Sequence, residues 1–423
     1  MRPDLKFLFE PKRVVMIGAS GLKGEDEIYS THFFLVKERL PSFKGKVHIV
    51  DVQGKLAGGE SLSAIKKDAL TIILLPPQLL DKNIKKILQK STCVVLLSRG
   101  GDKSAQMLSS FSKRGVVVGP ASFGVVNTSN GLIATISGNF QRGKVAVVSD
   151  DPLLAEMAAE KAGESGAGVS KFVCMGELGL QLMQMLEFLR QDKETEIICL
   201  VLKNIPTRKD IDFIKIVSSG KPVLVISARV EEKIFVSAVK QAGGILAESL
   251  EEMFNGARML VGGRPMRGRR VAVVTNSKSA GLLAEKWIEK SGMTLAAVPP
   301  EVFEKSGKSF SIDGFVDIGE EAGGEDYRRV VDRLSEEKEI DGLLVLAATG
   351  LGKLGEGDLQ KIVERCEKSK EKPAVLVALG AKSEAIAAIS RWRTPIFSNI
   401  QSAVAALKIS ALRKEIELRS PSR

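Results

Sequence analysis

Short apolar runs alternate with amphipathic stretches of helix length along the whole chain. The runs are rich in Val, Ile and Leu and are bounded by turn-forming residues, which is typical of strands buried on both faces of a parallel sheet. The stretches between them have the spacing of helices that pack one face on such a sheet. We therefore predict repeated βαβ units. The predicted strands are 14–18, 46–51, 71–75, 93–97, 115–118, 145–149, 171–175, 197–202, 222–227, 244–247, 271–275, 294–298, 314–318, 342–348, 374–379 and 394–398.

One pattern occurs three times and divides the chain: a basic residue, a β-branched run, then small or polar residues that lead into a helix. The copies are KRVVMIGAS at 12–20, GKVAVVSDD at 143–151 and GRRVAVVTNS at 268–277. Each copy opens an α/β unit, so we predict an α/β protein of three doubly wound parallel-sheet domains. The predicted divisions are residues 1–140, 141–262 and 268–412, followed by a frayed tail over 413–423.

Composition supports a globular protein with several cores, since 44% of the 423 residues are hydrophobic and 27% are charged. No apolar stretch reaches the roughly 18 residues of a membrane span, and the start lacks an apolar signal core, so we expect no membrane association and a cytoplasmic location. The net charge of +11 favours anionic partners such as nucleotides, CoA or nucleic acid. With two Tyr, two Trp and no nucleic-acid motif, we do not expect nucleic acid, and we interpret the basic cluster Arg264–Arg270 as a solvated linker.

Cysteine and histidine usage limits the possible chemistry. The four cysteines lie far apart, three of them inside apolar runs, which indicates reduced core thiols and not a disulfide framework. The only histidines are His32 and His48, which are too few for a His-rich metal site and leave little choice for a Ser-His-Asp triad. We assign no catalytic residue and no metal ligand.

A ligand cleft is predicted at the turns that follow the strands of the first unit, because ligands of open parallel sheets bind beyond the carboxyl ends of the strands. Glycines 18, 21 and 24 follow the first strand and would let backbone N–H groups approach a phosphate, although their spacing is not that of the dinucleotide motif. Asp51 ends the second strand, where an acid can bond an NAD ribose but repels phosphate. The candidate cofactor-binding residues in these turns are Gly18, Ala19, Ser20, Gly21, Lys23, Gly24, Asp51, Pro76, Ser98, Gly100, Gly119 and Pro120, and Lys55 could also meet a phosphate.

The order of the motifs resembles the α subunit of ADP-forming acyl-CoA synthetases, relatives of succinyl-CoA ligase, from about residue 8 to about residue 410. The resemblance implies a CoA-binding Rossmann-like domain followed by two flavodoxin-like ligase domains. It implies CoA or acyl-CoA as the ligand, ATP or ADP bound only through an ATP-grasp β-type partner subunit, and an oligomer. It also adds Asn127 to the CoA-binding candidates. The motifs that carry it are FEPKRVVMIGAS, KVHIVD, LLPP, GPASFGVVN, GKVAVVSDD, SKFVCMG, LEFLRQD, KPVLVIS, VKQAGGILAESLEEMF and RVAVVTNS.

The resemblance further implies a histidine in the second domain that carries a phosphoryl group, and this feature is missing here. The segment after KPVLVIS runs through Arg229 to Glu231 without a histidine. The family's small Ser-Gly turn after the second opening strand is replaced by Asp150 and Asp151, which would cap the next helix and repel a phosphoryl group. The third copy, Thr275, Asn276 and Ser277, still resembles a helix N-terminus able to hold an anion, so we treat it as the remnant of a phosphate site.

Two further departures concern the CoA pocket and the third domain. The family's Asn-Pro after the second strand is Asp51-Val52 here, and its Asn after Gly-Pro is Ala121. The segment Gly350–Asp358 stands where the family has a Thr-Pro turn and is interpreted as a mobile loop. Three functions therefore remain open: a CoA-binding regulatory or scaffolding paralogue without its own phosphoryl relay, an active ADP-forming acid–CoA ligase subunit that works with an ATP-grasp partner, and an NAD-linked oxidoreductase.

Overall fold

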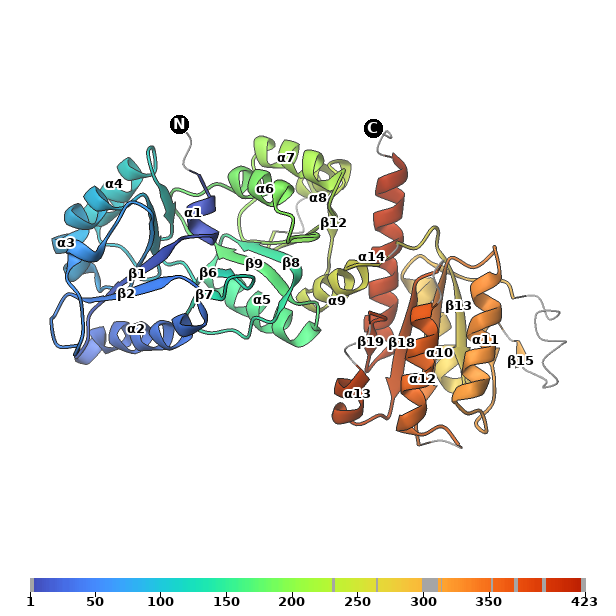
Figure 1. Cartoon of the computed structure of the whole chain (residues 1–423). Helices are drawn as coiled ribbons and strands as arrows, with labels where there is room; N and C mark the ends of the chain where they lie inside the picture. Colours follow the sequence, from blue (N-terminus) through green and yellow to red (C-terminus); the bar gives the residue numbers. More distant parts are fainter. Residues whose placement is uncertain are drawn as a thin grey trace. The chain divides into compact units, whose positions relative to one another are not determined.

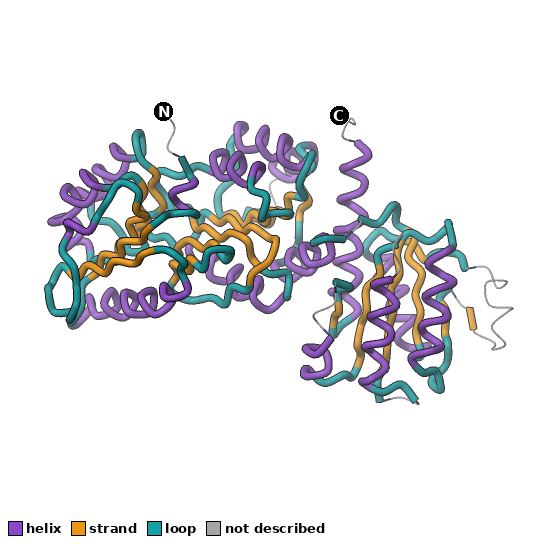
Figure 2. Tube along the Cα trace, viewed as in Figure 1, coloured by secondary structure: helices purple, strands orange, loops and turns teal. Residues whose placement is uncertain are grey.

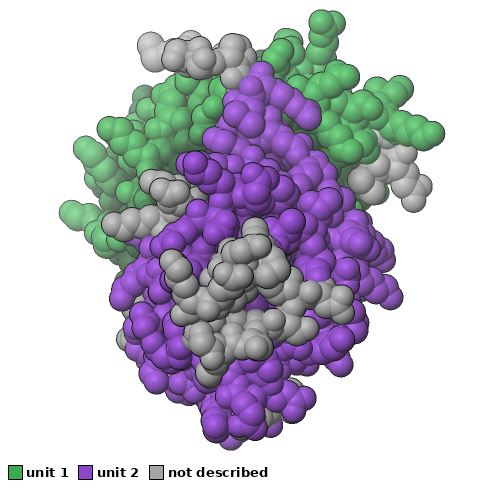
Figure 3. All heavy atoms as spheres, turned by 90° about the vertical axis from the view of Figure 1, so that its right-hand side faces the viewer, with its two compact units in different colours: residues 1–250 green, residues 251–423 purple. Residues whose placement is uncertain are grey.

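The computed structural model describes residues 4–229, 233–263, 265–298, 311–312, 314–350, 353–368, 372–389 and 393–419 (Figures 1 and 2). The chain separates into two compact units, residues 1–250 and residues 251–423 (Figure 3). The described residues form three parallel-dominated sheets flanked by helices. The predicted α/β fold with three doubly wound sheets is confirmed.

The first sheet is fully parallel, with strand order β2-β1-β3-β4-β5. This is the 2-1-3-4-5 order of doubly wound folds, whose switch point, where the chain reverses the direction of strand addition, lies between β1 and β3. Each predicted strand of the first unit is present. The elements are α1 (Lys6–Phe9), β1 (Arg13–Gly18), α2 (Glu27–Arg39), β2 (Lys46–Asp51), β3 (Ala69–Ile73), α3 (Pro77–Lys90), β4 (Cys93–Leu96), α4 (Asp102–Phe111) and β5 (Val116–Val118).

The second sheet repeats this order with β9-β8-β10-β11-β12 and adds two antiparallel strands, β6 and β7, beside β9. The added strands were not predicted, and they place residues 124–135 in the second sheet although they precede the predicted boundary at 140. The elements are β6 (Gly124–Asn127), β7 (Leu132–Thr135), β8 (Arg142–Ser149), α5 (Pro152–Ser165), β9 (Val169–Cys174), α6 (Leu182–Gln191), β10 (Ile197–Leu202), α7 (Arg208–Ser218), β11 (Val223–Ser227), α8 (Lys233–Gln241) and β12 (Ile245–Leu246).

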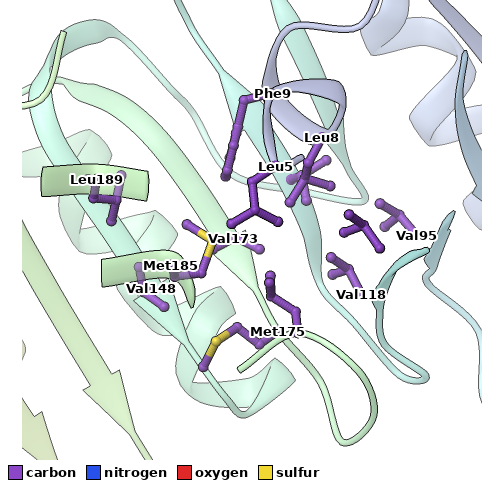
Figure 4. Close-up of a cluster of buried hydrophobic side chains, with 14 of the residues drawn as sticks. Leu5, Leu8, Phe9, Val95, Val118, Val148, Val173, Met175, Met185 and Leu189 are labelled. Carbon is purple, nitrogen blue, oxygen red and sulfur yellow. The ribbon is translucent and has the colours of Figure 1, made fainter. Parts of the chain in front are cut away.

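One hydrophobic core joins the first two sheets (Figure 4). Leu8 and Phe9 of α1 lie in the same buried cluster as Val118 of β5 and Val173 of β9. The Phe9 ring stacks on Phe188 of α6 with ring centroids 5.1 Å apart. The first two sheets are therefore parts of one packed unit, and the division predicted between them stays a prediction.

The third sheet lies in the second unit and again has the 2-1-3-4-5 order, with β13 as its first strand and β17 beside it. The short strands β14 and β16 pair with the same side of β13. The elements are α9 (Leu250–Leu260), β13 (Arg270–Thr275), α10 (Lys278–Lys290), β14 (Thr294–Leu295), β15 (Ser311–Ile312), β16 (Val316–Asp317), α11 (Gly324–Glu336), β17 (Gly342–Ala348), α12 (Glu356–Lys368), β18 (Ala374–Leu379), α13 (Ser383–Ile389), β19 (Ile396–Phe397) and α14 (Ile400–Arg419).

The last helix corrects the expectation of a frayed tail. Helix α14 continues to Arg419, and Arg413 is buried on it and bonded to Glu417 at 3.0 Å. Helix α9 packs against α14 so closely that a Cβ on Gly256 would lie 2.3 Å from the Ile409 side chain. The predicted tail is therefore helical up to Arg419, and residues 420–423 lie outside the described part of the chain.

The basic cluster and the glycine-rich segment are also more ordered than expected. Arg269 pairs with Glu415 at 2.6 Å, and Arg270 pairs with Asp341 at 3.0 Å, so both tie the linker to the second unit. Arg264 lies outside the described residues. Leu354 is buried, and the segment from Glu356 to Asp358 is the first turn of α12, so this part of the expected loop is helical.

All four cysteines are buried and free, as expected for core thiols. Burial raises the pKa of the Cys174 thiol to about 11, so that thiol is protonated and unreactive near neutral pH. Among the described residues, no cluster of His, Cys, Asp and Glu has the grouping that could hold a metal ion. None of the described helices has the length and apolar character required to cross a membrane.

Candidate functional site

The turn after β1 is shaped by a glycine that serves packing. A Cβ on Gly18 would lie 2.1 Å from the Phe33 ring of α2, so only glycine lets α2 approach the end of β1. Ala19 is buried, and its carbonyl accepts a hydrogen bond from the Ser30 hydroxyl at 2.8 Å. Gly18 and Ala19 therefore set the position of α2 and do not face solvent.

The open part of this turn is Gly21 to Gly24. Gly21 and Gly24 have φ values of +66° and +65°, which suit glycine, and the space around Gly24 is empty to 4 Å. A Cβ on Gly21 would lie 3.6 Å from the Lys55 Nζ. Lys23 is exposed in the same turn. The turn thus presents backbone and two cations to solvent at the switch point of the first sheet.

At the start of α2, backbone N–H groups favour the binding of an anion, whereas the acidic side chains there disfavour it. The N-cap residues of the short 3-10 turn at 24–26 and of α2 form no side-chain capping bond. The Glu27 N–H donates to the Gly24 carbonyl, so the N–H groups without a cap are those of the 3-10 turn. However, Glu25, Asp26 and Glu27 follow one another there, and carboxylates near a bound phosphate repel it. Lys23 and Lys55 are the residues that offset this repulsion.

Asp51 is a structural carboxylate that holds the cleft together. Its two oxygens accept the Ser20 N–H at 3.1 Å, the Ser20 hydroxyl, and the N–H groups of Gln53, Lys55 and Leu56 at 2.9, 3.0 and 2.9 Å. Burial raises the pKa of Asp51, but these hydrogen bonds together lower it by a larger amount. The pKa of Asp51 therefore lies below its usual value. Because both oxygens are occupied, the structure gives Asp51 no free acceptor for a ribose.

The turns after β3 and β4 lie beside one another, as predicted. The N–H of Leu75, the residue before Pro76, donates to the Ser98 hydroxyl at 3.3 Å. The Ser98 carbonyl accepts the Ala121 N–H at 3.0 Å. A Cβ on Gly100 would lie 3.7 Å from the Pro120 ring. The structure therefore brings Pro76, Ser98, Gly100 and Pro120 to one edge of the first sheet.

Gly119 and Pro120 meet the second sheet. The Gly119 N–H donates to the Met175 carbonyl at 2.8 Å, and the Gly119 carbonyl accepts from Leu178 at 3.2 Å. A Cβ on Gly176 would lie 2.5 Å from the Gly119 Cα, so the two glycines let the backbones touch. This candidate pair fixes one sheet against the other, and Ala121 beside it has a positive φ of 53°.

Asn127 does not lie with the other candidates. It is fully buried on β6, where its Nδ2 donates to the Phe9 carbonyl at 2.8 Å and its Oδ1 accepts from Ser129 at 3.1 Å. Phe9 precedes β1, so this contact is at the amino end of the first sheet, opposite the turns described above. The Asn127 side chain therefore connects β6 to α1 by a hydrogen bond.

The switch point of the second sheet, between β8 and β10, is occupied by carboxylates. Asp150 Oδ1 accepts the Lys203 N–H at 2.6 Å, and its Oδ2 accepts the Asn204 N–H at 3.0 Å. Asp151 caps α5 through the N–H groups of Leu153 and Leu154 at 3.0 and 3.1 Å. The expectation that both acids cap α5 is therefore wrong for Asp150, whose carboxylate instead bonds the turn after β10.

These carboxylates take the donors that an anion would use. Backbone N–H groups at a helix start and at a strand end, with a nearby ammonium group, are the usual elements of a phosphate site. Here the donors are bound to Asp150 and Asp151, and Lys203 Nζ lies 3.3 Å from Asp151 Oδ2. Sequence reasoning did not find Lys203 and Asn204. The signal available was that they directly follow β10, the strand beside β8 in a 2-1-3 order.

A cavity of about 640 Å³ adjoins this switch point. Asp150 and Glu177 line it together with Arg208, and Met175 and Leu202 supply apolar wall. Thr207 caps α7 with a capping box to Asp210, whose Oδ1 also accepts the Met183 N–H at 2.9 Å. The cavity is thus bounded by fixed loops and contains both acidic and basic groups.

The switch point of the third sheet is closed by Asn276. Its Oδ1 accepts the Ala348 N–H at 2.9 Å, its Nδ2 donates to the Ala348 carbonyl at 3.0 Å, and the Tyr327 hydroxyl lies 2.9 Å from the same Oδ1. Thr275 Oγ1 accepts the Ser277 N–H, and Ser277 caps α10. All three candidate side chains of the phosphate-site remnant are committed to contacts within the protein.

Both histidines lie in the part of the chain that forms the first sheet and its helices. His48 Nδ1 lies 2.8 Å from Glu60 Oε1 on an edge strand. Partial burial lowers the pKa of His32 on α2, while the charge of Glu156 raises it, and the burial effect is the larger. Neither histidine lies in the connection between β11 and α8, and residues 230–232 of that connection are outside the described part of the chain.

Comparisons with known proteins agree with the fold. The model of the succinyl-CoA ligase like flavodoxin domain matches residues 142–233. The alpha subunit of acetate–CoA ligase (ADP-forming) I of Pyrococcus furiosus is 26% identical over 458 residues, covering 97% of each chain. The alpha subunit of ligase II from the same organism is 26% identical over 381 residues, covering 81% of this chain and 82% of its own.

The fold itself is shared with a solved enzyme. The dinucleotide forming acetyl-coenzyme A synthetase 1 of Ca. Korarchaeum cryptofilum, in complex with phosphate and ADP, superposes with a TM-score of 0.85 at 22% identity, over 99% of both chains. The resemblance predicted from the sequence is therefore confirmed, since the chain is similar to alpha subunits of ADP-forming acetate–CoA ligases over nearly its whole length.

Proposed function

We propose that this chain is an α-type subunit that binds CoA or an acyl-CoA thioester at the first sheet and does not itself relay a phosphoryl group. The observation that carries the proposal is the contrast between two equivalent switch points. At the first, Gly21 and Gly24 are open and Lys55 lies beside them. At the second, Asp150 and Asp151 hold the anion-binding donors.

The relatives also support a second candidate, an active ADP-forming acid–CoA ligase subunit. Two of them are named as alpha subunits of such ligases and match most of the chain. In this candidate an ATP-grasp β-type partner binds ATP or ADP, and a group outside this chain carries the phosphoryl. Both candidates need a partner subunit and the same CoA cleft. We do not propose the NAD-linked oxidoreductase, because the oxygens of Asp51 are already occupied.

Titration calorimetry with CoA, acetyl-CoA, NAD and ADP tests the cleft. We expect CoA or its thioester to bind with a Kd in the micromolar range, about −8 kcal/mol. The double variant Lys23→Glu and Lys55→Glu is expected to weaken binding about tenfold, because each reversal replaces an attraction for phosphate with repulsion. Both lysines are exposed, so the variant should fold.

The matched control reverses Lys215 and Lys240, exposed lysines on α7 and α8 that change the net charge equally. CoA affinity should change less than twofold in this control. Equal CoA affinity in the Lys23/Lys55 variant and wild type, or preferential binding of NAD, would show that the first switch point is not a CoA site.

A further inference from the structure

The excess of positive over negative charge is confined to the first part of the chain. Residues 1–149 contain 22 Lys and Arg against 11 Asp and Glu, whereas residues 150–423 contain 40 of each. The whole excess of +11 therefore belongs to the first sheet and the strands that follow it. Two lysines near Gly21 account for only a small share of this excess.

Much of the excess gathers on α3, α4 and the turn after α4, which we call the basic face. Asp81 on the same helices is held by the Ser104 N–H at 2.8 Å, and Asp102 is an exposed acid in the first turn of α4. Among the described residues, no ion pair satisfies any of the cations of this face. The exposed side chains that form the basic face are Lys82, Lys85, Lys86, Lys90, Lys103, Lys113 and Arg114.

A groove of about 480 Å³ lies between the two helices within the basic face. Met107 supplies the partly exposed part of its apolar floor, above the buried side chains of Leu88 and Phe111, and Lys85 and Arg114 stand on its rim. The Arg114 guanidinium lies over the Phe111 ring, 5.3 Å from the ring centroid. The groove thus combines an apolar floor with cations that form no ion pair with the described residues.

The groove is separate from the CoA cleft proposed above. Its lining residues come from the second half of α3 and from positions 106–114, the later part of α4 and the turn after it. The turns after β3 and β4 instead lead into the first residues of these helices. The groove is therefore toward the amino end of the strands and the cleft is at the carboxyl end. A ligand in the cleft does not account for the groove.

We propose that this groove binds an acidic segment of a partner protein that places an apolar side chain on the floor and carboxylates on the rim. Charge complementarity identifies the partner, since unpaired cations around an apolar floor attract an acidic peptide and speed its encounter. Single-stranded nucleic acid fits less well, because it requires exposed aromatic rings for base stacking and Phe111 is 3% exposed. The inference does not depend on the proposed function.

The test is fluorescence anisotropy of the full chain with a labelled glutamate-rich peptide that contains two leucines three residues apart. The double variant Lys85→Glu and Arg114→Glu is expected to weaken binding about tenfold, because both rim charges are reversed. The Lys215→Glu and Lys240→Glu control, with the same change of net charge, is expected to change affinity less than threefold. Circular dichroism confirms that both variants fold, and CoA affinity should be unchanged in the rim variant.

Four results would overturn the inference. The first is no binding of the peptide to wild type, and the second is equal weakening by the rim variant and the control, which indicates general attraction by net charge. The third is unchanged affinity when the leucines of the peptide are replaced by serines, which removes the role of the floor. The fourth is tighter binding of a single-stranded DNA of equal charge that is lost in the rim variant, which assigns the face to nucleic acid.

Discussion

Alanine in place of Asp51 is expected to destabilise the first unit by about 3 kcal/mol or more, because each buried donor left without an acceptor costs about 1–3 kcal/mol. The carboxylate holds Ser20 on one side and the backbone of Gln53 to Leu56 on the other, so both turns lose their anchor together. Urea unfolding followed by circular dichroism measures the change. Asp102→Ala, which removes an exposed acid from the first turn of α4, is the control and should cost less than about 1 kcal/mol.

The effect of Asp51 should also depend on pH. The folded-state pKa of Asp51 lies below its usual value, so the carboxylate stabilises the folded state near neutral pH, and this contribution is lost as the pH falls through the folded-state pKa. The difference between wild type and Asp51→Ala should therefore shrink as the pH is lowered well below about 4. A difference that is small at pH 7, or that grows on acidification, would contradict the role assigned to Asp51.

Alanine at Gly18 is expected to destabilise the same unit by about 3 kcal/mol, at the upper end of the usual cost of overpacking a core. The added Cβ would lie 2.1 Å from the Phe33 ring, which is itself fully buried and cannot move away without disturbing α2. Gly220→Ala is the control, because its Cβ would meet no atom closer than 3.9 Å. Urea unfolding should leave the control within about 0.5 kcal/mol of wild type.

A second substitution separates the contact with Phe33 from other causes. If the clash is the reason, Phe33→Leu should recover part of the stability lost in Gly18→Ala, because a smaller side chain leaves room for the Cβ. No recovery, or a Gly18→Ala variant as stable as wild type, would contradict the packing assigned to this glycine. A charged residue at Gly18 would unfold the sheet and is therefore a poor probe of ligand binding.

The fold was predictable because its main signal is local. The three copies at 12–20, 143–151 and 268–277 became β1, β8 and β13, each of which takes the first position in a 2-1-3-4-5 strand order. Strands β6 and β7 were missed because they are short and pair antiparallel, β6 with both β7 and β9, and such pairing is not visible in the pattern of one segment. A frayed tail was predicted from residue 413 because this segment is polar, whereas in the structure Glu415 pairs with Arg269, which is distant in the sequence.

The candidate site was harder to predict, because the role of a carboxylate depends on which N–H and hydroxyl groups the fold brings within hydrogen-bond distance of it. Asp51 lies at the predicted edge, but its oxygens are taken by the loop that follows it. Asp150 was expected to act on its own helix and instead bonds Lys203 and Asn204 across two adjacent strands. The glycine turn shows the same limit, since Gly18 serves packing while Gly21 and Gly24 remain open.

The measurement that tests the central proposal most directly is phosphoryl transfer to the chain. The chain is incubated with radiolabelled ATP and an ATP-grasp β-type subunit, with the alpha subunit of Pyrococcus furiosus acetate–CoA ligase I as the positive control. Because Asp150 and Asp151 hold the donors at the second switch point and no histidine follows β11, we predict no acid-labile phosphate on this chain. Label recovered as phosphohistidine at His32 or His48 would contradict the proposal.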